Sequence, residues 1–221
     1  MNPLATVAAL ACLSIPAIAT EPSAAGPGAF KTDPEGFILN WLVLEPVRLT
    51  NLQHTEAAVR AIVARDDVKE PLTALPKAGD AAAAGGATNE WHALDSRNYL
   101  ISLTGFASEL HKPTVSVVFY GVAYVTVPEE MKEARLSIGS DDDSIWWVNG
   151  KEMISAFGVR QTATDDNVSK RLTLNKGVNV VRFAVIQGDG PSDCCARFFD
   201  ARQKPITNLT VSLDLPAAGG K

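Results

Sequence analysis

The chain has 221 residues with a formal net charge of −5, and 46% of its residues are hydrophobic. Its lysines and arginines are scattered, so the sequence offers no basic patch for nucleic acid or for an anionic lipid surface. Aromatic and β-branched residues are frequent after Phe37, which excludes intrinsic disorder for most of the chain and predicts one folded domain.

The N-terminal segment 1–19 is expected to be a signal peptide. Leu4–Ala19 is apolar, and Ala17-Ile18-Ala19 has the small-x-small form that signal peptidase accepts. No basic residue precedes this run, so an uncleaved membrane anchor is the alternative, although a span comfortably needs about 20 apolar residues. Cleavage would place the protein outside the cytoplasm, periplasmic or secreted, without a membrane span. Residues 20–35, rich in Ala, Gly, Pro and Ser, are expected to form a flexible linker.

The folded domain is expected to cover residues 36–215. Its first strand is predicted at Phe37–Leu44, which is apolar and is followed by a proline. A helix is predicted over 52–65, because apolar residues recur there at helical spacing after a capping box at Thr50 and Gln53.

The chain then changes to a segment rich in proline, alanine and glycine, which ends in the run Ala81–Ala84. Its low complexity predicts a mobile loop. At the other end of the domain, residues 216–221 are expected to be a disordered tail.

From Trp91 onward the sequence predicts strands. The longest run, Val115–Val127, is largely apolar on both faces, which is typical of a central strand that is covered on both sides. Further strands are predicted at 99–103, 134–138, 145–148, 152–154, 171–174, 178–186, 196–199 and 209–213. Many short strands separated by turns, such as Asn149-Gly150, predict an all-β jelly-roll sandwich, with the one short helix as an insertion.

An acidic run, Asp141, Asp142 and Asp143, lies between two predicted strands. Calcium prefers several oxygen ligands, and adjacent carboxylates can supply them, so these three residues are candidate metal ligands. The alternative is that they form a turn and accept hydrogen bonds from backbone amides.

Two adjacent tryptophans follow the acidic run. Strand alternation places Ile145 and Trp147 on one face and Trp146 and Val148 on the other. We predict that Trp147 is in the core and that Trp146 is exposed, where an indole can stack on a sugar ring or anchor a protein interface. The alternative is a sandwich covered on both faces, with both rings buried.

Catalytic motifs are absent from the sequence: it contains no nucleophile elbow, zinc-protease motif, P-loop or dinucleotide fingerprint. The histidines His54, His92 and His111 are isolated along the chain, and no enzyme is predicted. Adjacent Cys194 and Cys195 form either a strained, easily reduced disulfide or two thiols on opposite faces of a strand, one buried and one exposed.

Several of these motifs resemble those of a known group of domains. Ser140-Asp141-Asp142 followed by Trp147-Val148-Asn149-Gly150 is similar to the "SDDG-x-x-x-W-x-N-G" hairpin of exported bacterial jelly-roll modules, the PA14 and galactose-binding-like carbohydrate-binding domains. Weaker similarities lie at 37–44, at 174–179 and at 200–205, and together they cover most of the chain. The chain departs from the pattern at Asp143, where the pattern has glycine, and at Gln203-Lys204, which replace the glycine of the closing turn.

The resemblance implies a non-catalytic module that binds carbohydrate or glycoconjugate outside the cytoplasm. In calcium-dependent PA14 adhesins an adjacent aspartate pair binds the ion, and Asp141 and Asp142 match that pair. Trp146, Asn149 and Asp189 are the candidate ligand-binding residues. The alternative function is a structural or accessory subunit of a cell-envelope complex, with a protein partner in place of the carbohydrate; an enzyme ranks third.

Overall fold

The structure is a computed structural model that describes residues 29–215, apart from the side chain of Lys69. The expected signal peptide at 1–19 and the expected tail at 216–221 lie outside the described residues. Within 29–215, no helix combines the length and the apolar character needed to cross a bilayer.

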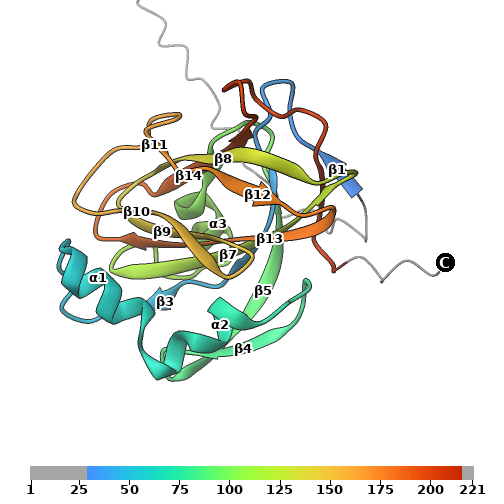
Figure 1. Cartoon of the computed structure of the whole chain (residues 1–221). Helices are drawn as coiled ribbons and strands as arrows, with labels where there is room; N and C mark the ends of the chain where they lie inside the picture. The colour runs from blue at the N-terminus through green and yellow to red at the C-terminus, as the bar shows by residue number, and fades with distance from the viewer. Residues whose placement is uncertain (1–28, 216–221) are drawn as a thin grey trace, which may run out of the picture.

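The described strands form two antiparallel sheets (Figure 1). The larger sheet contains, in spatial order, β10 (Lys151–Ala156), β9 (Asp143–Val148), β13 (Gly177–Gln187), β7 (Val117–Val127), β2 (Asn40–Leu44), β5 (Ala87–Asp95) and β4 (Ala81–Ala84). Beside this path, β3 (Val47–Arg48) and β15 (Thr210–Ser212) pair with β7, and β1 (Ala29–Lys31) pairs with β15. The smaller sheet contains β11 (Asn167–Val168), β8 (Met131–Ser140), β14 (Asp193–Phe199) and β6 (Ile101–Ser102), with β12 (Leu172–Leu174) beside β8. The expected all-β sandwich is confirmed.

The first core lies between the two sheets. Trp41, Trp146 and Phe183, from three strands of the larger sheet, are all fully buried there. The Trp41 ring lies 5.9 Å from Trp146 and 5.1 Å from Phe183 between centroids, in edge-to-face arrangements. Gly121 makes this packing possible, because a Cβ at that position would lie 2.2 Å from the Phe183 ring. Leu136 on β8 closes the core from the smaller sheet.

A second core covers the outer face of the larger sheet. Leu42 and Tyr120 point to this side, where they belong to one buried cluster with Val59 and Val68 of the helical segment. That segment consists of α1 (Glu56–Val63), a 3₁₀ turn (Asp66–Val68) and α2 (Lys69–Thr73), and it lies below the sheet in Figure 1. The sandwich therefore has a third layer, and β7 is covered on both faces as the sequence predicted.

The helical content differs from the single helix that the sequence predicted. The predicted helix is present but shorter: α1 begins after Thr55, whose side chain accepts a hydrogen bond from the Ala58 amide, and not at a box formed by Thr50 and Gln53. Two further helices are present, α2 and α3 (Leu103–Glu109). The apolar residues of α3 belong to the first core, so this helix is held by burial despite its shortness.

Two segments that were expected to be irregular are strands. Ala81–Ala84, expected to be a mobile loop, is β4 and pairs with β5 through a turn at Gly85 and Gly86, both of which have positive φ. This turn geometry suits hairpins, and the glycine pair permits it. The described part of the expected linker 20–35 also corrects the prediction, because Ala29–Lys31 is β1 and pairs with β15. The folded domain therefore begins before residue 36.

Both cysteines of the adjacent pair are free and buried. Cys194 belongs to the core between the sheets, and the side chain of Cys195 points to the opposite face of β14. Cys195 is only 1% exposed, so the prediction of one exposed thiol is wrong. Burial raises the pKa of the Cys195 thiol to about 11, with smaller opposing contributions, and therefore makes it a poor nucleophile at neutral pH.

Candidate functional site

The acidic run lies where the chain passes from one sheet to the other. β8 of the smaller sheet ends at Ser140 and β9 of the larger sheet begins at Asp143, so Asp141 and Asp142 form the crossing; the peptide bond between them is cis. The crossing is partly buried at one end of the sandwich. Asp142 is 3% exposed and Asp143 is fully buried, whereas Asp141 is half-buried.

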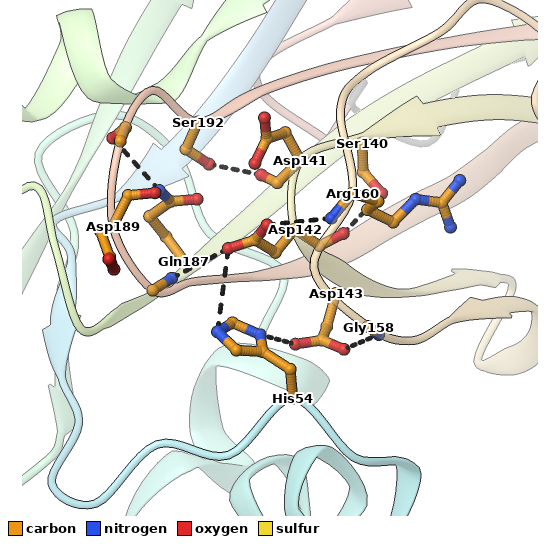
Figure 2. A network of polar contacts seen from close by, with 12 residues as sticks. His54, Ser140, Asp141, Asp142, Asp143, Gly158, Arg160, Gln187, Asp189 and Ser192 are labelled. Carbon is orange, nitrogen blue, oxygen red and sulfur yellow. Dashed lines mark hydrogen bonds and ion pairs between the residues drawn. The ribbon is translucent and has the colours of Figure 1, made fainter.

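Asp142 joins three segments that are far apart in the sequence (Figure 2). Its Oδ1 accepts a hydrogen bond from the Arg160 amide at 3.2 Å, and its Oδ2 accepts one from the Gly188 amide at 3.2 Å. His54 Nε2 lies 3.9 Å from the same Oδ2. The Asp142 carboxylate thereby holds the β10–β11 connection, the β13–β14 loop and the segment before α1 together.

Asp143 has both carboxylate oxygens occupied by the protein. Oδ1 accepts a hydrogen bond from the Gly158 amide and Oδ2 lies 2.6 Å from His54 Nδ1. Burial raises the pKa of Asp143, and the contacts with Gly158 and His54 oppose this rise. These contacts make Asp143 an anchor for His54.

Asp141 carries a carboxyl group whose pKa is shifted by its surroundings. Burial, followed by the adjacent Asp142 carboxylate, raises the pKa of Asp141 to about 6. Its backbone is fixed, because the Asp141 amide donates to the Asp193 carbonyl at 3.0 Å and the Ser192 hydroxyl donates to the Asp141 carbonyl at 2.8 Å. Two acidic groups are thus held in proximity at the rim of the sandwich, where like charges oppose full ionisation.

Gln187, at the end of β13, is a polar residue of the site that the sequence did not reveal. It is fully buried, and its Nε2 donates to the carbonyl oxygens of Asp189 at 2.7 Å and Gly190 at 3.2 Å. Its Oε1 is buried and has no hydrogen-bond partner among the described residues. Gln187 precedes Gly188, whose amide donates to Asp142, so the unpartnered acceptor belongs to the residue next to a contact of this carboxylate (Figure 2).

The other candidate residues divide between the site and the rest of the sandwich. Asp189 is exposed on the loop beside Gln187, at the site. Asp143 begins β9, and Asn149 follows its other end, in the turn to β10. The Asn149 side chain donates to Asn179 Oδ1 and accepts a hydrogen bond from the Val180 amide. The structure therefore does not bring Asn149 to the acidic crossing.

Trp146 is buried, so the prediction that it is exposed while Trp147 is in the core is wrong. Trp146 is 0% exposed and its Nε1 donates to the Ser144 hydroxyl at 3.0 Å. Trp147 is half-buried on the outer face of the sheet. The alternation was predicted correctly, but both faces of this sheet are covered, and the face between the sheets holds Trp146.

The acidic crossing fits calcium through oxygens of more than one kind. No three His, Cys, Asp or Glu side chains within 29–215 are grouped to hold a metal ion. Calcium, however, accepts carboxylate, amide and backbone carbonyl oxygens together with water. Asp141, Asp142 and the unpartnered Gln187 Oε1 carry oxygens of these kinds, and the assignment of Asp141, Asp142 and Asp143 as metal ligands stays a prediction.

His54 was missed because nothing in its spacing connects it with Asp143, from which it is separated by 89 residues. Gln187 could have been noticed only as a polar residue at the end of an apolar strand. His54 enters the site through the packing of the segment before α1, which the sequence did not reveal, and Gln187 enters it at the end of β13.

Comparison with known proteins gave structural matches only. No protein-family model and no curated protein matches the chain. Among solved structures, a PA14 sugar-binding domain from an RTX adhesin has 13% identity and a TM-score of 0.48, covering 79% of this chain and 99% of its own. The PA14 domain of the antifreeze protein MpAFP has 14% identity and a TM-score of 0.48, covering 89% and 98%. The Epithelial Adhesin 9 A domain from Candida glabrata, in complex with Galb1-4GlcNAc, has 13% identity and a TM-score of 0.38, covering 87% and 97%. These are the domains that the sequence motifs resemble, and at these values the likeness says nothing about a ligand of this chain.

Proposed function

We propose that this chain is a non-catalytic, extracytoplasmic binding module for carbohydrate or glycoconjugate, and that it binds its ligand at a calcium ion held by Asp141 and Asp142. The observation that carries the proposal is the buried, unpartnered Oε1 of Gln187, the residue before Gly188, whose amide binds Asp142. A buried acceptor without a donor costs free energy, and a cation at this position would satisfy it.

The charges of the crossing support the same proposal. The Asp142 carboxylate adds to the burial that raises the pKa of Asp141, and a bound divalent cation would favour the ionised form of both groups. Asp142 Oδ1 accepts one backbone amide, which leaves a lone pair for a cation, whereas Oδ2 contacts both the Gly188 amide and His54. Two carboxylates and one amide oxygen form a sparse ligand set, so water and ligand hydroxyls would complete it.

The surroundings of the crossing favour a sugar as the ligand. Vicinal hydroxyl groups are oxygen ligands of the kind that calcium accepts. Val159 is 77% exposed, and it stands between Gly158 and Arg160, whose amides bind Asp143 and Asp142. An exposed apolar side chain next to a polar centre offers a contact for the apolar face of a sugar ring.

A location outside the cytoplasm agrees with both the expected signal peptide at 1–19 and the sparse ligand set. Extracellular calcium modules operate with dissociation constants of about 10⁻⁴–10⁻³ M, weaker than the sensors inside cells. A site with two carboxylates suits that range.

Thermal unfolding with calcium and with EGTA tests the calcium site. A ligand that binds only the folded state stabilises it, so calcium at about 10 to 100 times its dissociation constant should add about 1–3 kcal/mol, a shift of a few degrees in Tm. Asp141→Asn and Gln187→Leu should reduce the calcium-dependent shift, whatever their effect on Tm in EGTA. Glu129→Gln removes the same charge from an exposed residue and should leave the shift unchanged.

A glycan array probed in calcium and in EGTA tests the ligand class. We expect retention of a subset of glycans in calcium only. A Tm that calcium leaves unmoved up to about 10 mM, well above the range of extracellular modules, would show that Asp141 and Asp142 only form a turn. A calcium-dependent shift in Tm without glycan retention would refute the carbohydrate ligand but support the calcium site.

A further inference from the structure

A pocket lies on the outer face of the larger sheet, against the helical segment. It has a volume of about 490 Å³ and is lined by, among others, Arg60, Leu72, Trp147, Glu152 and Arg182. Pockets of about 300–1,000 Å³ accommodate small molecules. It shares none of its lining residues with the acidic crossing.

The floor of the pocket is a row of side chains from three neighbouring strands. Trp147 on β9 is registered opposite Glu152 on β10 on one side and opposite Arg182 on β13 on the other. Registered residues of neighbouring strands point to the same face and lie about 5 Å apart. The row therefore runs from an anion, over a half-buried indole, to a cation.

The walls of the pocket come from the helical segment. Arg60 of α1 donates to both carboxylate oxygens of Glu152 at 3.1 Å, and it also binds Glu56 in its own helix. Leu72 of α2 adds an apolar side. Because Arg60 is shared between Glu152 and Glu56, this end of the row keeps a net negative charge and presents carboxylate oxygens as hydrogen-bond acceptors.

Arg182 forms the cationic end and has no acidic partner. It is 5% exposed, and its guanidinium donates to the carbonyl oxygens of Pro71, Thr73 and Ala74 at the end of α2. No ion pair joins Arg182 to a carboxylate among the described residues. Its burial lowers the pKa of this arginine, and a guanidinium has five N–H donors, more than these carbonyls use. A buried cation of this kind is stabilised by an anion.

We propose that this pocket binds a sugar that carries a carboxylate, a uronic acid, independently of calcium. The carboxylate lies against Arg182, the apolar face of the pyranose ring lies on Trp147, and ring hydroxyls donate to Glu152. A uronic acid combines these three chemistries within one ring. The proposal adds a second ligand site to the chain and does not depend on the acidic crossing.

Calorimetric titration of the full chain in EGTA tests this proposal. Glucuronate is the probe, glucose is its match without the carboxylate, and benzoate is a flat carboxylate without hydroxyls. Glucuronate should bind at least about tenfold more tightly than either, because charge-assisted hydrogen bonds and the hydroxyl contacts both contribute. In the proton NMR spectrum, the indole N–H of Trp147 should shift on addition of glucuronate.

Variants separate the pocket from the rest of the protein. Arg182→Gln keeps amide donors for the carbonyls of α2 but removes the charge, and it should weaken glucuronate binding about tenfold or more. Arg48→Gln removes an exposed arginine elsewhere, and Asp141→Asn alters the acidic crossing; neither should change the affinity. The Trp147 signal of the wild type keeps the test decisive should Arg182→Gln unfold.

Three outcomes would overturn the proposal. Equal binding of glucose and glucuronate would remove the role of Arg182, and tighter binding of benzoate would replace the sugar with an aromatic carboxylate. The proposal would also fail if glucuronate up to about 10 mM gave neither heat nor a shift of the Trp147 signal. The binding free energy would then be weaker than about 3 kcal/mol. Calcium-dependent glycan binding at the crossing would be unaffected by any of these results.

Discussion

Trp146 and Trp147 occupy adjacent positions on β9 but have different surroundings. The sequence correctly placed them on opposite faces, because strand alternation depends only on local geometry. Which face lies between the sheets depends on what packs on each, and here both faces are covered. Local sequence carried no information on that choice, so the assignment of the buried ring failed.

Replacement of the buried indole tests the corrected assignment. Trp146→Ala should lower the free energy of unfolding by about 3–5 kcal/mol, because it leaves a cavity beside Trp41 and Phe183. Trp147→Ala removes a half-buried ring from the outer face and should cost less. Urea denaturation of both variants measures the difference, and a larger loss for Trp147→Ala would contradict the burial of Trp146.

The acidic crossing shows how far residue types alone can predict a site. The sequence identified Asp141, Asp142 and Asp143 as a cluster, since they are adjacent. It did not identify His54, although Asp143, the residue that departs from the motif's glycine, is the one that binds it. The departure is therefore linked to a partner in another layer, and such links arise only through tertiary packing.

At the scale of elements, the sequence predicted most strands of the two sheets but missed β5, which has nine residues, and several short strands at the margins. β1 and β4 are rich in alanine or lie in a segment rich in glycine and proline, so their own composition does not favour a strand. They are formed because a neighbour offers hydrogen-bonding groups: β15 for β1 and β5 for β4. Edge strands of this kind depend on their partner more than on their own sequence.

The connection between β10 and β11 is held on the smaller sheet by Asp165. Its carboxylate accepts a hydrogen bond from the Ser137 hydroxyl at 2.7 Å and one from Arg197 Nε at 3.0 Å, and a further Arg197 nitrogen contacts it. Burial acts to raise the pKa of Asp165, but the hydrogen bonds from Arg197 and Ser137 outweigh it and lower the pKa. The ionised form is thus stabilised more in the folded state than in the unfolded chain.

Asp165→Asn should therefore reduce the free energy of unfolding at pH 7 by about 1.5–3 kcal/mol, the range for hydrogen bonds to charged groups. The contribution of Asp165 is present above the pKa of an unfolded aspartate and is lost as the pH falls through the lower folded value. The difference between wild type and variant should shrink on acidification, as measured by urea denaturation from pH 7 to pH 3. Glu133→Gln breaks an exposed pair with Arg171 and should change stability by less than about 1 kcal/mol. A difference that is constant with pH would show that Asp165 acts without its charge.

At the scale of the whole molecule, the larger sheet belongs to both cores. β2 sends Leu42 to the outer core and Val43 to the inner one, and β7, β9 and β13 divide their side chains in the same way. The sequence predicted this for β7 from its two apolar faces, and the sandwich followed from the number of strands. It did not predict the third layer, because α1 and α2 are too short to show which face of the sheet they cover.

A sheet shared by two cores should make the domain unfold as one unit, since neither core can open without the strands of the other. Leu42→Ala in the outer core and Leu136→Ala in the inner core remove the same fully buried side chain on opposite sides of the sheet. Each should lower the free energy of unfolding by about 2–5 kcal/mol. Each should also shift one common transition, followed in urea by tryptophan fluorescence and by far-UV circular dichroism. If Leu42→Ala instead produced an early step that left the fluorescence of the buried Trp41 and Trp146 unchanged, the helical layer would be an independent unit, and the shared sheet would not couple the two cores.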